Sequence, residues 1–422
     1  MFEKKNTYFP IKTSTACQLK WNWSTLILTE GTTSSCHRCF KIPLDKNNFD
    51  SFHNLPHKIK EREIMLSGKW PTIENGGSGH CEVCKDIEDS GGISDRLHHL
   101  QIPNQTPKEL LTNPSATSVT PQILEIFLNS SCNLKCTYCT TKDSSKWAAE
   151  VEKYGPLTSM DGKIITGFDR KINHPDTRFF FEKTLEWIKR HGNGLKRLHL
   201  LGGETFYQKE LQEVLDVLKQ LKNPHLELNI VSNLMVKEDV YKNYIEQIKK
   251  LCKDRRIGRF DLTCSIDNWG AEAEYVRFGL KLNSWEKLFA YTVDQKWIYL
   301  NINQVITSLT MNTMIDLIKV INNYRKTRPI NQHITPVVNR PWMHPKIYGY
   351  KFWSNTISGI LGELPEDSKR NILSKKYLTG IFKSIPDVGP DHKQISTLKF
   401  FLDELDKRRN TNWRKIFPYL DI

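Results

Sequence analysis

Six short apolar runs alternate with amphipathic helical patterns from residue 123 onward, and this order constrains the fold more than any other feature. A strand, a helical crossover and a second strand form a right-handed unit with parallel strands. We therefore predict an α/β fold, either an open parallel sheet or a partial barrel. The apolar runs cover 124–128, 197–201, 226–231, 260–266, 302–307 and 334–338, and the helical patterns cover 179–191, 209–222, 237–254, 284–294 and 312–326.

Three cysteines, Cys132, Cys136 and Cys139, follow the first predicted strand in a C-x3-C-x2-C arrangement. Thiolates this close together can hold three irons of a [4Fe–4S] cluster and leave the fourth iron open. Their polar neighbours do not suit an apolar core, whereas Cys264 lies in a predicted buried strand and is expected to be a core residue. The triplet therefore predicts a cluster that binds a ligand and does chemistry.

The composition is that of a soluble globular protein. Of the 422 residues, 38% are hydrophobic and 26% are charged. No apolar run approaches the ~20 residues needed to span a bilayer, and the first residues lack the apolar core of a secretory signal. We expect a cytoplasmic protein without a membrane partner, whose reduced cysteines bind metal rather than form disulfides.

The net charge of +14 results from 61 basic and 47 acidic residues. It permits nucleic acid, acidic peptides or nucleotides as partners. It requires none of them, because the basic residues are spread along the chain without a long block or an RNA-reading motif.

Changes in composition divide the chain into four parts. Residues 1–100 are rich in Cys, Gly and Trp and lack long helical periodicity, and residues 101–122 form a linker with Pro, Ser and Thr. Residues 123–345 hold the alternation of strands and helices. Residues 346–422 are expected to form a C-terminal helical extension, which contains no cysteine.

Polar residues follow the predicted strands at the points where they end. Ligands of parallel α/β folds bind at these carboxyl ends, so we expect the polar residues and the cysteines to share one rim. Gly202 and Gly203 allow the backbone to approach a ligand, and Glu204 offers a carboxylate to an ammonium group. The other candidates are Tyr138 for stacking on a base, Ser265 and Asp267 for a ribose diol, Arg277 for a carboxylate, and Asn233 after the third strand.

The order of these motifs resembles the radical S-adenosylmethionine (SAM) superfamily over about residues 120–345. The resemblance is carried by the cysteine triplet with Tyr138, Gly202–Glu204, the Ser-Asn pair ending at Asn233, and Ser265-Ile-Asp267 followed by Tyr-Val-Arg277-Phe-Gly. It implies a partial (β/α)6 barrel, in which Cys132, Cys136 and Cys139 hold a [4Fe–4S] cluster and SAM binds the open iron. The implied contacts of SAM are Gly202–Glu204 at its amino group, Tyr138 at the adenine, Ser265 and Asp267 at the ribose, and Arg277 at a carboxylate or at the substrate.

This resemblance also implies an activity, that of an oxidoreductase. One electron from the reduced cluster, supplied by a partner such as flavodoxin or ferredoxin, cleaves SAM to methionine and a 5′-deoxyadenosyl radical, which abstracts hydrogen from a substrate. The segments Ser144–Trp147 and Trp413–Pro418 are similar to those of uncharacterised twitch-type radical SAM proteins of phages. That similarity implies a peptide or protein substrate, and modification of RNA or a nucleotide is the alternative.

Five cysteines precede the first predicted strand: Cys17, Cys36, Cys39, Cys81 and Cys84. The C-x13-G-x4-C spacing from Cys17 to Cys36 is similar to the opening of SPASM and twitch domains. It implies an auxiliary [4Fe–4S] cluster that Cys81 and Cys84 complete, with Cys39 as a spare or a substitute. The alternative is a zinc site on the two C-x2-C pairs, as in a zinc-ribbon protein that binds nucleic acid. This alternative gives no role to the central triplet.

Overall fold

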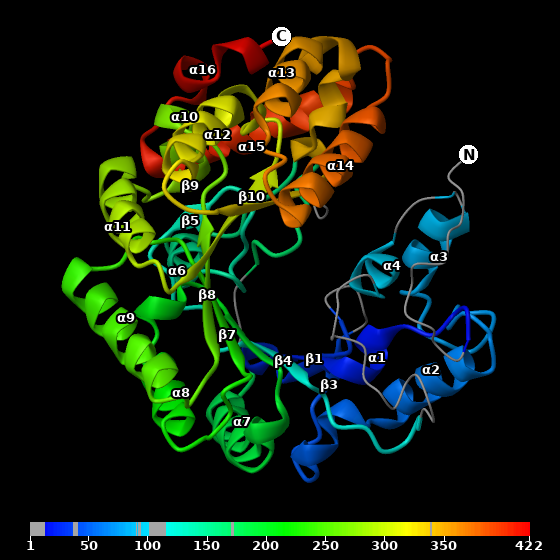
Figure 1. Cartoon of the computed structure of the whole chain (residues 1–422). Coiled ribbons are helices and arrows are strands. Elements are labelled where there is room, and N and C mark those ends of the chain that lie inside the picture. Colours follow the sequence, from blue (N-terminus) through cyan, green and yellow to red (C-terminus); the bar gives the residue numbers. More distant parts are fainter. Residues whose placement is uncertain are drawn as a thin grey trace.

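The structure is a computed structural model that describes residues 13–36, 41–89, 91, 94–100, 115–169, 173–337 and 340–422. Within these residues the chain is a mixed α/β structure built on a sheet of nine strands, in the order β11-β10-β8-β7-β6-β4-β1-β2-β3 (Figure 1). A small second sheet pairs β5 (Lys135–Cys136) with β9 (Arg277–Phe278). Cys136 and Arg277 thus belong to the small sheet, whereas Gly202–Glu204, Asn233 and Asp267 follow strands of the large sheet.

Six strands of the large sheet are parallel and lie side by side in chain order. They coincide within a few residues with the apolar runs of the sequence, so the prediction of an α/β fold with a parallel sheet is confirmed. The closure of this sheet into a partial (β/α)6 barrel stays a prediction. The strands are β4 (Ile123–Phe127), β6 (Arg197–Leu201), β7 (Glu227–Ser232), β8 (Arg259–Ser265), β10 (Tyr299–Ile306) and β11 (Asn331–Pro336).

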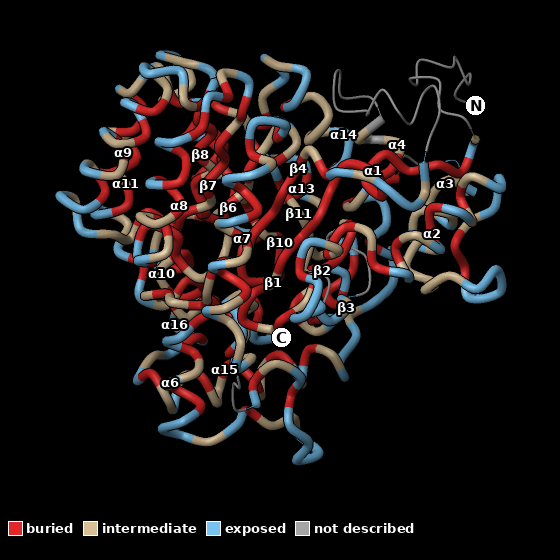
Figure 2. The backbone as a smooth tube through the Cα atoms, turned by 90° about the horizontal axis from the view of Figure 1, so that it is seen from below, coloured by how far each residue is buried: buried red, intermediate tan, exposed pale blue. Residues whose placement is uncertain are grey.

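One face of the sheet is apolar and covered by helices. Leu124, Leu198 and Leu228 belong to a single buried core, because alternate residues of each strand point to the same side. Figure 2 shows that burial is concentrated on the strands and on the inner sides of these helices. The covering helices are α7 (Thr177–His191), α8 (Glu210–Leu218), α9 (Glu238–Lys253) and α11 (Leu282–Asp294), and α12 (Met311–Arg325) follows β10 (Figure 1).

The opposite face of the sheet carries a row of polar residues. Glu125, His199, Asn229 and Asp261 are partners across four neighbouring strands and form one row on this face. A face lined with charged and amide side chains is poorly suited to packing against another apolar layer. It is therefore the face of the sheet that suits a ligand.

The N-terminal segment extends the sheet beyond β4, which the sequence analysis did not predict. β1 (Trp23–Ile27) runs parallel to β4, β2 (Thr32–Ser34) runs antiparallel to β1, and β3 (Ile42–Pro43) runs antiparallel to β2. Leu26 lies in the same apolar core as Leu124. The cysteine-rich segment is thus joined to the sheet by backbone hydrogen bonds, while the domain boundaries drawn from the sequence stay predictions.

Two further groups of helices lie in the N-terminal and C-terminal parts of the chain, and the short helix α10 (Gly270–Val276) follows β8. α1 (Gln18–Asn22), α2 (Pro56–Leu66), α3 (Glu82–Asp89) and α4 (Asp95–Leu100) lie in the N-terminal part. α13 (Tyr350–Glu363), α14 (Lys369–Lys383), α15 (His392–Arg409) and α16 (Trp413–Ile416) share a second apolar core with α12. None of the described helices combines the length and the apolar character that crossing a membrane requires.

Replacement of Leu26 tests whether the N-terminal strand unfolds together with the sheet. Its side chain is 0% exposed, so Leu26→Ala is expected to lower the free energy of unfolding by about 2–5 kcal/mol in a single guanidinium transition. Ile73→Ala removes a side chain that is 73% exposed. This control is expected to change the free energy by less than about 0.5 kcal/mol. A separate early transition, with the main midpoint unchanged, would contradict joint unfolding.

Candidate functional site

The three central cysteines lie in the loop of residues 128–144, the cysteine loop, between β4 and α6 (Ser145–Tyr154). Cys132 and Cys136 are buried and pack around Leu134. The partly buried side chains against this cluster are Tyr138, Cys139 and Met235. The fold therefore gathers the predicted thiols in one apolar place at the carboxyl end of the first of the six strands.

Two elements hold the backbone of the cysteine loop. At the start of α6, three side chains donate hydrogen bonds to loop carbonyl oxygens: Ser144 Oγ to Leu134 (2.6 Å), Ser145 Oγ to Cys132 (3.1 Å) and Trp147 Nε1 to Cys136 (2.8 Å). In the small sheet, Cys136 of β5 is the partner of Arg277 in β9. These bonds use the carbonyl groups of a buried loop and so favour one loop conformation.

Gly202 and Gly203 bring the turn after β6 against the same loop. A Cβ atom on Gly202 would lie 2.4 Å from the carbonyl oxygen of Asn129, and one on Gly203 would lie 2.4 Å from that of Ser131. The Gly203 amide donates to Asn129 O (2.9 Å) and the Glu204 amide donates to Ser131 O (2.8 Å). The two glycines thus allow this turn to approach the backbone that leads into Cys132.

The carboxylate of Glu204 is fully buried and connects the ends of β6 and β7. It accepts hydrogen bonds from Asn233 N (2.6 Å), Ser232 Oγ (2.8 Å) and Phe206 N (3.1 Å). Burial raises the pKa of Glu204 to about 7, although these hydrogen bonds lower it. The side-chain nitrogen Nδ2 of Asn233 also lies 3.7 Å from the sulfur of Cys132. Glu204 therefore positions a neighbour of the first cysteine.

The buried residues Asp267 and Arg277 and the partly buried Tyr138 form a second polar cluster on this rim. The Arg277 guanidinium donates to both oxygens of Asp267 at 2.9 and 2.8 Å, and the Tyr138 hydroxyl donates to the same carboxylate at 2.7 Å. The Val305 amide donates a further bond of 2.9 Å. Asp267 thereby orients Tyr138 and Arg277, and its role toward a ribose stays a prediction. Ser265 ends β8 two residues before it.

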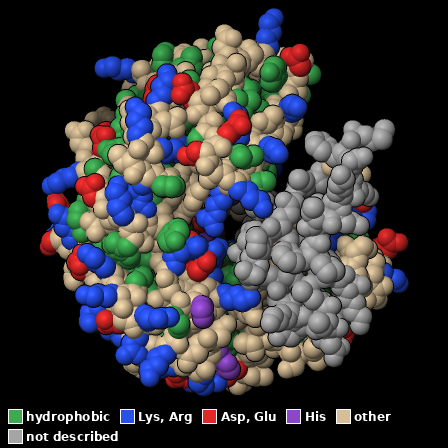
Figure 3. Space-filling model, in the orientation of Figure 1, with side chains coloured by type: hydrophobic (Ala, Val, Ile, Leu, Met, Phe, Trp, Pro, Cys, Tyr) green, Lys and Arg blue, Asp and Glu red, His purple; other side chains and the backbone are tan. Residues whose placement is uncertain are grey.

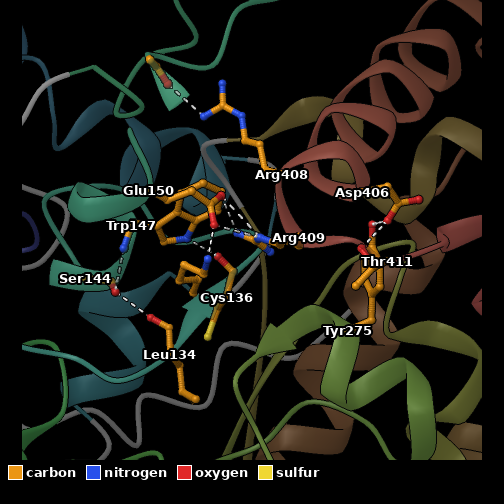
Figure 4. A network of polar contacts seen from close by, with 12 residues as sticks. Leu134, Cys136, Ser144, Trp147, Glu150, Tyr275, Asp406, Arg408, Arg409 and Thr411 are labelled. Atoms are coloured by element: carbon orange, nitrogen blue, oxygen red, sulfur yellow. Dashed lines mark hydrogen bonds and ion pairs between the residues drawn. The ribbon is translucent and has the colours of Figure 1, made fainter. Parts of the chain in front are cut away.

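A buried ion network joins the cysteine loop to the C-terminal helices (Figure 4). Glu150 of α6 pairs with Lys135 of the loop and, at 3.3 Å, with Arg409 at the end of α15. The Arg409 guanidinium also lies 4.5 Å from the centre of the Trp147 ring. Glu150 and Arg409 are 259 residues apart in the chain, so no local pattern could have indicated their pairing.

Four of the five N-terminal cysteines line one cavity with a histidine and an arginine. The lining includes Cys17, Cys36, Cys81, Cys84, His80 and Arg96. Burial raises the pKa of Cys17 to about 12, while the positive charge of Arg96 lowers it. Cys39 lies outside the described residues.

The two groups of cysteines are not drawn together as tightly as bound metal ligands are. Among the residues that the structure describes, no three His, Cys, Asp or Glu side chains are close enough to hold a metal ion. The donor chemistry fits iron or zinc, because both groups offer thiols in largely apolar surroundings. Metal binding itself pulls such ligands into place and releases their protons.

Comparisons with known proteins yield only distant similarities. No protein-family profile and no curated protein matches the chain at a significant level. Native anSMEcpe with bound AdoMet is 18% identical with a TM-score of 0.36, and the same protein with bound AdoMet and Cp18Cys peptide is 17% identical with a TM-score of 0.35. Each alignment covers 60% of this chain, and the chain spans 61% and 60% of the two solved chains. Both TM-scores are low, so the proposals below depend on the residues of this chain.

Glu150 tests whether the buried ion network stabilises the fold. Glu150→Ala leaves the buried charge of Arg409 without its carboxylate and is expected to cost about 3–5 kcal/mol of stability, measured by urea denaturation. Glu152→Ala, at an exposed position of the same helix, is the matched control and should cost less than about 0.5 kcal/mol. Equal losses in the two variants would show that the network does not stabilise the fold.

Proposed function

We propose that the protein is a radical SAM enzyme and that Cys132, Cys136 and Cys139 hold its [4Fe–4S] cluster. The supporting observation is that three separate elements converge on the cysteine loop. These are the Gly202–Glu204 turn, the Asp267–Arg277–Tyr138 cluster and the start of α6. A simple electron carrier needs a fourth cysteine near the triplet, and a zinc-ribbon protein that binds nucleic acid leaves this convergence unexplained.

SAM is the ligand that this site suits. Three thiolates leave one iron of a four-iron cluster open, so a further ligand can bind there. When bound, the cluster supplies the electron that cleaves SAM to a 5′-deoxyadenosyl radical, which abstracts hydrogen from the substrate. We assign Gly202–Glu204 and Asn233 to the amino end of SAM, Tyr138 to the adenine, Ser265 and Asp267 to the ribose, and Arg277 to a carboxylate.

The chain contributes orientation and protection from water. Asp267 fixes the Tyr138 hydroxyl and the Arg277 guanidinium, and Glu204 fixes the backbone at Asn233. Asp267 and Glu204 are both fully buried, so these groups are fixed before a ligand arrives. Preorganised groups in a dry site act more strongly on charge than the same groups in water. The electron comes from a reductant such as flavodoxin or ferredoxin.

We assign a second metal to the N-terminal cysteines. Cys17, Cys36 and the Cys81–Cys84 pair come from separate segments and line the same cavity. Burial raises the pKa of Cys17, and the nearby guanidinium of Arg96 opposes this rise. The metal is an auxiliary [4Fe–4S] cluster, with zinc as the alternative, and both fit an all-thiol donor set.

Cys136 provides the test of the central cluster. Anaerobic wild-type protein is expected to be brown, and Cys136→Ala is expected to lose about four irons per chain and the formation of 5′-deoxyadenosine with dithionite. Cys264→Ala, at a cysteine that is 0% exposed in the apolar core, should keep both. Iron, sulfide and product are counted in parallel. Unchanged iron in Cys136→Ala, or continued SAM cleavage, would overturn the assignment.

Cys81 and Cys84 provide the test of the second metal. The double variant Cys81→Ser, Cys84→Ser is expected to lose either about four irons or about one zinc per chain while it keeps the central cluster. Iron, sulfide and zinc counts distinguish the auxiliary cluster from a zinc site. Cys252→Ser, at a partly buried cysteine of α9, is the control. Wild-type metal content in the double variant would remove the N-terminal site from the proposal.

A further inference from the structure

The C-terminal helices reach the cysteine loop through Arg409, the last residue of α15. The helix ends there, and Asn410 after it takes a left-handed conformation (φ 53°). The Arg409 side chain is buried, and Figure 4 shows its guanidinium pointing toward the start of α6. The helix dipole favours a cation at the carboxyl end of a helix. This part of the chain thus adds a buried positive charge to the surroundings of the thiols.

Three neighbours fix the Arg409 guanidinium. Its Nε and Nη2 lie 3.3 and 3.4 Å from the Glu150 carboxylate, and its central carbon lies 4.5 Å from the centre of the Trp147 ring and 4.9 Å from that of the Phe278 ring. The remaining nitrogen, Nη1, is buried without a hydrogen-bond partner in the described part of the chain. Glu150 offsets only part of the positive charge, because its single carboxylate also pairs with Lys135. An arginine stays protonated in proteins, so its charge is permanent.

Two of these neighbours also belong to the surroundings of Cys136. Trp147 Nε1 donates a hydrogen bond of 2.8 Å to the Cys136 carbonyl oxygen. Phe278 lies in β9 opposite Lys135, the residue before Cys136. One side chain, that of Trp147, therefore joins Arg409 to the backbone of the second cysteine of the triplet.

The charge of Arg409 also acts on the Cys136 thiol. A hydrogen bond with the Cys139 thiol is the main effect that lowers the pKa of Cys136, and the positive charges of Arg277 and Arg409 lower it further. A group that stabilises the thiolate of a cysteine stabilises negative charge in general at that position. The same guanidinium would therefore act on a cluster that these thiolates hold.

A buried charge acts on its neighbours more strongly than a surface charge does. The net charge of the chain is +14, and Figure 3 shows Lys and Arg side chains spread across the visible face. Charges on the surface are surrounded by water and screened by salt. Arg409 is only 9% exposed, and the lower dielectric of its surroundings weakens its field less. Arg409 is thus distinct from the general basic character of the protein.

Reduction of a [4Fe–4S] cluster adds one electron, which the external reductant supplies, and breaks no bond to the chain. The reduced cluster carries one more negative charge than the oxidised cluster, so a nearby positive charge favours the reduced form. Net charge and solvent exposure are among the properties that set the potential of such clusters. A cation held beside one of the three thiolates therefore favours reduction.

We propose that Arg409 raises the reduction potential of the cluster held by Cys132, Cys136 and Cys139, so that the cluster is easier to reduce. The C-terminal helices, to which the sequence analysis gives no chemical role, contribute this residue to the site. Arg409 acts through the charge of its guanidinium and needs no contact with SAM or the substrate. The inference rests on the proposed radical SAM function, because it requires the cluster.

Redox titration of the full-length, anaerobically iron-loaded protein tests this proposal. The reduced cluster is measured by electron paramagnetic resonance, and the signal that is lost in Cys136→Ala belongs to the central cluster. Arg409→Gln is expected to lower the ratio of reduced to oxidised cluster about tenfold at a fixed potential, which corresponds to about 59 mV for a one-electron couple. Arg409→Lys keeps the positive charge and is expected to change this ratio less than about twofold.

Two further variants separate the charge of Arg409 from its packing. Arg408→Gln is the matched control, because the Arg408 guanidinium donates to the carbonyls of Gly155 and Pro156 at 2.9 and 3.0 Å. This control is expected to change the ratio less than about twofold. Glu150→Gln keeps the shape of the side chain and removes its negative charge, so it is expected to raise the ratio. It keeps the test decisive if Arg409→Gln folds poorly.

Four results would overturn the proposal: an unchanged ratio in Arg409→Gln, an equal fall in Arg408→Gln, an equal fall in Arg409→Lys, or no rise in Glu150→Gln. Iron counts distinguish this failure from failure of the radical SAM assignment. A central cluster whose potential does not depend on Arg409 refutes only the effect of Arg409. Unchanged iron in Cys136→Ala refutes the cluster assignment, and the role of Arg409 with it.

Discussion

The candidate site depends on the hydrogen bonds that fix the backbone of the cysteine loop. A buried loop has to satisfy its amides and carbonyls within the protein, because no helix or long strand does so for it. Here the carbonyls of Cys132 and Cys136 accept bonds from Ser145 and Trp147, and the carbonyl of Ser131 accepts a bond from the Glu204 amide. The thiol positions follow from these bonds, so α6 and the Gly-Gly-Glu turn are part of the site.

The buried ion pairs around this loop serve position more than stability. Moving an ion pair out of water costs about as much free energy as the attraction between its charges returns. Replacing one partner of an existing pair, in contrast, is strongly destabilising. The Asp267–Arg277 pair fixes Tyr138, and the Glu150–Arg409 pair ties α6 to α15. A displaced loop would break the contacts of Tyr138 with Asp267 and of Lys135 with Glu150. These charges thus favour one arrangement of the thiols over its alternatives.

The repeating strands of the fold could be predicted from the sequence, whereas the contacts between distant segments could not. The run Arg197–Leu201 matches β6 because an apolar core face marks each strand locally. Strand order then places the cysteines and Glu204 on one rim, since parallel strands end on the same side. β1 was missed because Thr25 pairs with Glu125, 100 residues away, and nothing in the five residues of the strand itself specifies that partner.

The missed strand also determines how the two candidate metal sites relate to each other. Cys17 belongs to the apolar cluster of Trp23 and Ile123 at the amino ends of β1 and β4, whereas the cysteine loop follows the carboxyl end of β4. A strand rises about 3.3 Å per residue, so the length of the two paired strands separates these places by a distance on the order of 15 Å. A metal held by the N-terminal cysteines would therefore be too far away to share ligands with a cluster held by Cys132, Cys136 and Cys139. Such a metal would instead hold the amino end of β1 beside β4.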